Sequence, residues 1–151
     1  MPWNQKGSSK SRPDRGPLWL TASLVARAIT EAILSELRSI VDRQPQAATP
    51  VLDVGEESML DTRFHLCIAR ASGNELVAEI VDAIVTTFCS SNRAVLYLSG
   101  RIETSLSEHH AIIEAIQGGD VSHASKRARE HRRHGLAMLM QVLANYPLAK
   151  F

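Results

Sequence analysis

The stretch DTRFHLCIARASGNELVAEI, residues 61–80, contains two helical patterns separated by a break. Before the break, apolar residues recur at four-residue steps: Leu60, Phe64 and Ile68. The tripeptide Ser-Gly-Asn at 72–74 then interrupts the pattern, and four-residue steps resume from Glu75 to about Leu98. Two consecutive helices are therefore predicted. The second has a broad apolar face, which is typical of a central helix in a bundle.

The same spacing continues on both sides of this stretch, and no segment shows the strict alternation of a half-buried strand. Order is expected to begin near Pro17, and residues 42–50 are expected to form a loop. The other predicted helices run over 17–41 in two pieces with Thr30 as N-cap of the second, from Asp53 with Glu56 as capping-box partner, from Arg101 to Ile116 before Gly118–Gly119, and from Asp120 to about Leu143. The fold class is therefore all-α, with six or seven helices.

The composition indicates one soluble domain. A chain of 151 residues with 44% hydrophobic and 22% charged residues is long enough for one real core. Its net charge of +1 provides no basic field for nucleic acid or membrane, and no apolar run is long enough to span a bilayer. The polar residues 1–16 are expected to form a disordered leader, and residues 17–151 the helical domain. Cys67 and Cys89 lie in apolar helical patterns, so reduced thiols and a cytoplasmic location are expected.

Four residues have the chemistry of metal ligands. Asp61 and His65 are four apart in a helical segment, so their side chains leave one face at neighbouring heights. His109 and His131 fall on the apolar, inward sides of their helices. Each histidine by itself is more often an ordinary core or half-exposed side chain. Together, three imidazoles and one carboxylate in a bundle interior would suit zinc, nickel, manganese or iron.

Two strings resemble a known family. The stretch at 61–80 and the stretch EHHAIIEAIQGGDVSHASKRAREH, residues 108–131, resemble the two signature regions of the FCD domain, the C-terminal effector domain of FadR-type regulators in the GntR family. The weaker stretch LVARAITEAILSELRSIV, residues 24–41, is similar to the first two helices of that domain. The resemblance covers about residues 18–145.

The resemblance implies an antiparallel helical bundle that senses a ligand for a transcription regulator and is not an enzyme. It implies a divalent metal ion, with zinc the first expectation, and the implied ligands are Asp61, His65, His109 and His131. Coordination positions left open on the ion would accept a carboxylate oxygen of a small organic-acid effector. A homodimer is expected.

Further residues are candidates for the surroundings of this site. Arg93 and Arg101 are candidates to bind the effector carboxylate, although surface solvation is the ordinary role of such residues. His134 is a candidate to support a ligand by hydrogen bonding or to replace one. Glu108, next to His109, is expected to point elsewhere around the helix.

The chain departs from the family at its start, where DRGPLWL, residues 14–20, lacks the family's usual opening pattern. The first 16 residues are too few and too polar for a winged helix-turn-helix, so no direct DNA binding by this chain alone is expected. Two other functions stay open. One is a metal-dependent, hydrolase-like enzyme, disfavoured because Thr62 and Leu66 stand where a carboxylate base is expected. The other is a non-sensing oligomerisation module left from a truncated regulator.

Overall fold

The computed structural model describes residues 17–26, 29–47, 53–96 and 100–145, and within helices it leaves the side chains of 17–19, 45–47, 54 and 88–96 outside the description. The predicted disordered leader, residues 1–16, lies outside the described residues. The described part forms six helices and contains no strand: α1 (Pro17–Val25), α2 (Glu31–Ala47), α3 (Val54–Ala71), α4 (Glu75–Leu96), α5 (Arg101–Gln117) and α6 (Val121–Asn145). The all-α prediction and the predicted number of helices are confirmed.

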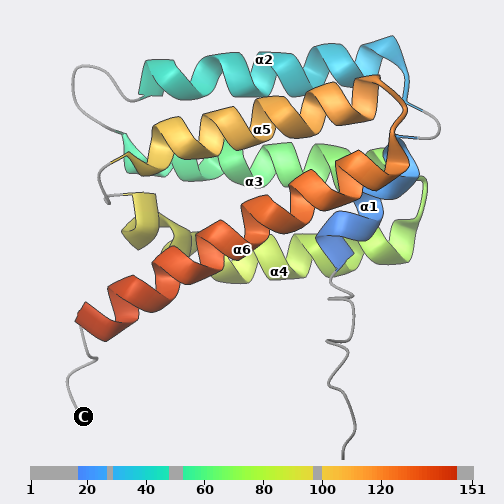
Figure 1. Ribbon diagram of the computed structural model, residues 1–151. Helices are drawn as coiled ribbons and strands as arrows, with labels where there is room; N and C mark the ends of the chain where they lie inside the picture. The colour runs from blue at the N-terminus through green and yellow to red at the C-terminus, as the bar shows by residue number, and fades with distance from the viewer. Residues whose placement is uncertain (1–16, 27–28, 48–52, 97–99, 146–151) are drawn as a thin grey trace, which may run out of the picture.

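The helices form a bundle crossed by one long diagonal element. Figure 1 shows α2, α5, α3 and α4 lying alongside one another, with α6 running obliquely across them. Helix α6 packs against α1, α5 and α4, while α3 packs between α2 and α4. An interior site can therefore receive side chains from several helices at once.

Side chains cap the helices at the predicted positions. Asp53 Oδ1 accepts a hydrogen bond from the Glu56 backbone N–H at 3.0 Å, and Asp120 Oδ1 accepts one from His123 at 2.9 Å. Such caps satisfy N–H groups that have no partner within the helix. Between α3 and α4 the chain turns at Gly73, whose φ of +69° is a conformation that glycine adopts without a steric penalty.

The hydrophobic core lies mainly between α2, α3 and α5. Its largest fully buried apolar side chains are Phe64, Leu37, Leu60, Ile112 and Ile116. They recur at helical spacing on the inward faces of their helices, as the sequence pattern predicts. The far half of α6 is different, because Leu136, Met140 and Leu143 are exposed there.

The loop predicted for residues 42–50 is wrong over 42–47. Helix α2 continues through Ala47 despite Pro45, and residues 48–50 lie outside the described part. The added turn places Gln44 in the interior with no exposed surface, and Arg43 pairs with Glu56 of α3 at 3.2 Å. These tertiary contacts outweigh the local preference of proline for a helix end.

The broad apolar face predicted for the helix from Glu75 is only partly buried. Leu76 is 64% exposed and Ile80 43% exposed, whereas Val81 is fully buried. Helix α4 packs against α3, α6 and α1 at the edge of the bundle (Figure 1), so it has neighbours on more than one side while part of its apolar face stays exposed. Among the described helices, none combines the length and hydrophobicity needed to cross a membrane.

Adjacent residues of α3 provide a test of this packing. Leu60 is 2% exposed and Met59 is 61% exposed. Leu60→Ala is expected to lower the free energy of unfolding by roughly 2–5 kcal/mol, because it removes buried methyl groups and leaves a cavity. Met59→Ala, the matched control, should change it by less than about 0.5 kcal/mol. Urea denaturation followed by circular dichroism measures both, and equal losses would contradict the described burial.

Candidate metal centre

Four side chains from three helices converge inside the bundle. Asp61 and His65 come from α3, His109 from α5 and His131 from α6, and each offers a ligand atom within 4.8 Å of the other three. Asp61 Oδ1 lies 3.4 Å from His109 Nε2 and 4.0 Å from His65 Nε2. The Nε2 atoms of His65 and His131 are 3.2 Å apart. The structure thus brings together all four residues that the sequence singles out as metal ligands.

Packing holds the imidazole rings in place. His109 has no exposed surface and stacks on Phe64, with ring centroids 4.0 Å apart. His65 meets the edge of the same phenyl ring, with centroids 5.5 Å apart. Because Phe64 lies between the two ligand positions of α3 and also touches α5, this one aromatic residue orients two of the three rings.

The electrostatics favour uncharged imidazoles. Burial lowers the pKa of His65 to about 4, and the neighbouring charges of His131 and Arg101 add to this effect while Asp61 opposes it. Burial and the charge of His131 also lower the pKa of His109 well below its usual value. A neutral imidazole keeps the nitrogen lone pair that a metal ion requires.

The donor set fits a divalent cation. His109 Nε2 is buried and makes no hydrogen bond, which is unusual for a polar atom inside a protein. A cation among the four donor atoms would satisfy it. Three imidazole nitrogens and one carboxylate oxygen form a ligand set typical of zinc and other first-row divalent metals.

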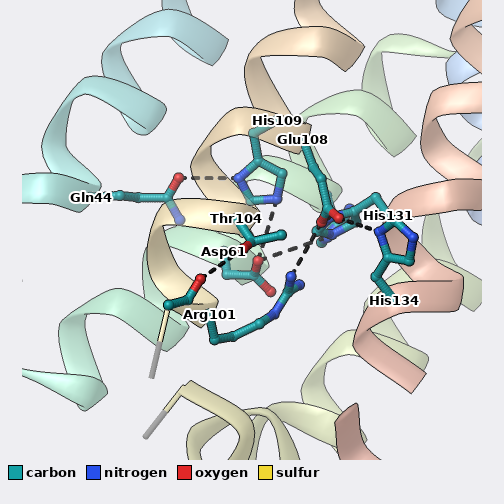
Figure 2. A network of polar contacts seen from close by, with 10 residues as sticks. Gln44, Asp61, Arg101, Thr104, Glu108, His109, His131 and His134 are labelled. Atoms are coloured by element: carbon teal, nitrogen blue, oxygen red, sulfur yellow. Dashed lines mark hydrogen bonds and ion pairs between the residues drawn. The ribbon is translucent and has the colours of Figure 1, made fainter. Parts of the chain in front are cut away.

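Two of the proposed ligands each have a partner on the other ring nitrogen. His109 Nδ1 lies 3.1 Å from Gln44 Oε1, and His131 Nδ1 lies 2.7 Å from Glu108 Oε2 (Figure 2). Such partners fix the orientation of a ligating histidine and the position of its proton.

Glu108 joins this network to two further side chains, Arg101 and His134. Its Oε2 pairs with Arg101 Nη1 at 3.2 Å, and its Oε1 accepts from His134 Nδ1. Burial acts to raise the pKa of Glu108, but the hydrogen bonds from His131 and His134 and the charges of His131 and Arg101 outweigh burial and lower it to about 2. The expectation that Glu108 points away from the site is therefore wrong.

The other candidates from the sequence have different outcomes. Arg101 is 3% exposed, so solvation on the surface is not its role. The imidazole of His134 is 47% exposed and contacts Glu108, which places it beside the cluster rather than within it. The side chains of Arg93 and Cys89 lie outside the described part.

Sequence reasoning missed Gln44 and Glu57. Both are fully buried, and Gln44 Nε2 donates to Glu57 Oε1 at 2.9 Å. The signal for Gln44 was its spacing, because it follows Leu37 and Val41 by seven and three residues on the same helical face. Gln44 is missed because the sequence pattern predicts a loop over residues 42–50.

The fold and the interior cluster define a class: all-helical domains that enclose a cluster of polar side chains within a bundle. The chain matches the FCD domain over residues 20–134, and it belongs to the FCD domain family of GntR-type regulators. An effector-binding domain of a regulator is accordingly the kind of module that the sequence encodes.

Named relatives agree with this family. The chain is 36% identical over 78 residues to the "Putative L-lactate dehydrogenase operon regulatory protein" of Escherichia coli K12, and equally to the protein of that name in Shigella flexneri. Each match covers 49% of this chain and 30% of the relative. Both relatives are named as putative operon regulatory proteins.

Two solved structures share the fold. Escherichia coli McbR/YncC has a TM-score of 0.70 at 15% identity, over 83% of this chain and 59% of that one. Streptococcus agalactiae GntR has a TM-score of 0.60 at 24% identity, over 84% of this chain and 51% of that one. The chain therefore spans little more than half the length of these proteins.

The buried carboxyl of Glu57 predicts a pH effect on stability. Burial and the charge of Asp61 raise its pKa from 4.5 to about 7, against the hydrogen bond from Gln44. Between these pH values the folded protein keeps a proton that the unfolded chain releases, so this group's contribution to stability falls as the pH rises. Glu57→Gln should therefore be more stable than the parent at pH 8 and similar to it at pH 5.

Denaturation with a chelator present measures this difference, with exposed Glu79→Gln as the control variant. A Glu57→Gln effect of the same size at both pH values would contradict the interpretation.

Glu108 is expected to matter for folding as well. Glu108→Ala leaves the buried Arg101 guanidinium without its carboxylate, which should cost about 3 kcal/mol of stability. Glu103→Ala removes an exposed carboxylate from the same helix and should cost less than about 0.5 kcal/mol. Thermal and urea unfolding of metal-free protein compare the two, and a negligible loss in Glu108→Ala would show that the ion pair adds no stability.

Proposed function

We propose that this chain is the ligand-sensing part of a GntR-type transcription regulator, in which a divalent metal ion and a small organic acid bind at the interior cluster. The observation that carries the proposal is the approach of four donor atoms from α3, α5 and α6 to within 4.8 Å of one another. The membership of the FCD family supports the same reading, because these domains serve regulators.

The metal would be held by Asp61, His65, His109 and His131. Zinc is the first choice for a set of three imidazoles and one carboxylate, and nickel, manganese and iron are alternatives. When bound, the ion would act as a Lewis acid with one or two positions open to a carboxylate oxygen.

Arg101 supports the choice of a carboxylate as effector. Its guanidinium is buried, and its Nε has no hydrogen-bond partner although its Nη1 pairs with Glu108. A planar guanidinium with a donor to spare is well suited to an anionic oxygen. Arg93 remains a prediction from sequence.

The regulatory step would follow from a change in packing. An effector that binds one arrangement of two paired chains better than another shifts the population toward that arrangement. We propose a homodimer as the unit that responds. One relative is named for an L-lactate dehydrogenase operon, so L-lactate belongs in the first set of ligands to test.

The two competing functions have less support. A metal-dependent hydrolase needs a carboxylate free to act as base, whereas Glu108 already accepts from His131, His134 and Arg101. A module that only oligomerises does not need an interior cluster of three histidines. The family match favours sensing over both.

Metal analysis and thermal unfolding test the proposal. Protein purified without chelators should contain about one equivalent of divalent metal, and adding L-lactate or citrate to it should raise Tm. A ligand at 100 times its Kd adds roughly 2.7 kcal/mol to stability.

His65→Ala should abolish both responses, while His110→Ala, an exposed neighbour of a proposed ligand, should keep them. If the parent protein binds none of zinc, nickel, manganese and iron, the sensing proposal fails and the oligomerisation module gains. Turnover of esters or amides that disappears in His65→Ala would favour the enzyme instead.

A further inference from the structure

Three buried polar side chains form a row joined by hydrogen bonds: His109, then Gln44, then Glu57. Gln44 of α2 reaches toward His109 of α5 (Figure 2), and the amide nitrogen of Gln44 bonds to Glu57 of α3. His109, Gln44 and Glu57 each have no exposed surface. The contacts are 3.1 Å from His109 Nδ1 to Gln44 Oε1 and 2.9 Å from Gln44 Nε2 to Glu57 Oε1. Water does not compete for these bonds, so they decide where the protons lie.

The row has a direction. A glutamine amide donates through its NH₂ and accepts through its oxygen, so its two ends cannot be exchanged freely. The carboxyl oxygen of Glu57 accepts from the NH₂ end, which turns the amide oxygen of Gln44 toward His109. The Nδ1 of a neutral His109 must then carry the proton, and its Nε2 must carry the lone pair.

The opposite tautomer would close the metal site. With the proton on Nε2, His109 would donate toward Asp61 Oδ1, which is only 3.4 Å away. That hydrogen would occupy the space between two proposed ligand atoms and remove the lone pair of one of them. If Nδ1 had no partner, a neutral His109 would be expected to carry its proton on Nε2. In that tautomer the buried Nε2–H group donates to the Asp61 carboxylate.

We infer that Gln44, held by Glu57, is a positioning residue that fixes His109 in the Nδ1–H tautomer and so keeps Nε2 available to a metal ion. This inference rests on the proposed metal site. It extends that site by two residues, Gln44 and Glu57, which are not among the four proposed ligands.

His131 and His109 are oriented by partners of different chemistry. Glu108 places a charged carboxylate directly on His131, and Arg101 balances that charge. At His109 an uncharged amide takes the same place, and the acidic group stands one residue further away. An amide orients a fully buried ring without adding a second net charge next to Asp61, which would carry a desolvation penalty.

The first test determines the tautomer of His109 in the 151-residue chain without metal. Long-range ¹H–¹⁵N correlation spectra distinguish the two neutral forms of each histidine, and His109 is identified by the signals lost in His109→Gln. The parent should show the proton of His109 on Nδ1. Gln44→Leu should move it to Nε2 or leave a mixture. A parent that carries it on Nε2, or a Gln44→Leu spectrum without change, would overturn the inference.

The second test uses a variant that exchanges the amide and the acid. In Gln44→Glu combined with Glu57→Gln, the NH₂ of residue 57 donates to the carboxylate of residue 44, which still accepts from His109 Nδ1–H. Volume and direction are both kept. Zn²⁺ competition titrations should show a 10- to 100-fold loss of affinity in Gln44→Leu and recovery to within a few-fold of the parent in the exchanged pair.

Gln117→Leu, an exposed glutamine of α5 that accepts from Arg38, is the control and should leave Zn²⁺ affinity unchanged. If the exchanged pair, which keeps the volume and the direction of the hydrogen bonds, binds Zn²⁺ as weakly as Gln44→Leu does, the inference is overturned. The two proposals also fail separately. A parent with the Nδ1–H tautomer but no Zn²⁺ binding would end the sensing proposal alone, whereas Zn²⁺ binding with an insensitive tautomer would end this one.

Discussion

The interior of this bundle is organised by the cost of taking ionisable groups out of water. His65 and His109 are held where burial strongly disfavours the imidazolium form, so both rings are neutral and must find partners for their nitrogens. Asp61 supplies one negative charge among them. The helices α2, α3, α5 and α6 each contribute at least one side chain that satisfies this cluster, and the packing of the bundle brings these groups together.

Two glutamates, Glu57 fully buried and Glu108 partly buried, show how local surroundings decide the state of the same chemical group. Glu108 receives hydrogen bonds from two histidines and an arginine, which hold its pKa near 2 in spite of burial. Glu57 receives one hydrogen bond from an uncharged amide, and its Oε2 has no hydrogen-bond partner, so burial prevails and its pKa rises to about 7. One carboxylate therefore serves as a fixed anion between α5 and α6, and the other as the acceptor that orients Gln44.

Much of the fold could be predicted because the signals are local. The steps of three and four residues predict the helices, and Asp53, Thr30 and Asp120 predict helix starts, which the structure confirms. The convergence of the four proposed ligands could also be predicted, because inward-facing side chains on neighbouring helices share one small interior. Their role as metal ligands stays a prediction.

The surroundings of the site could not be predicted, because they depend on contacts between distant segments. Gln44 and His109 are separated by 65 positions, and only the packing of α2 on α5 makes them partners. Pro45 favoured a loop by its local preference, and burial of the preceding turn overruled it. In the sequence Arg101 looks like an ordinary surface cation. Its burial is explained by its ion pair with Glu108, which only the structure shows.

Helix α6 is long and crosses the bundle obliquely, and the contacts of His131 hold it near its middle, so a small tilt there would move its far end. His131 lies near the middle of this 25-residue helix, and its far end at Asn145 is about 20 Å away at the usual helical rise. A tilt of about 5° around His131 would displace that end by about 2 Å over this length. The residues carried by the moving end include the apolar Leu136, Met140 and Leu143, so a small adjustment at the pivot would be converted into a change in the hydrophobic outline of the domain.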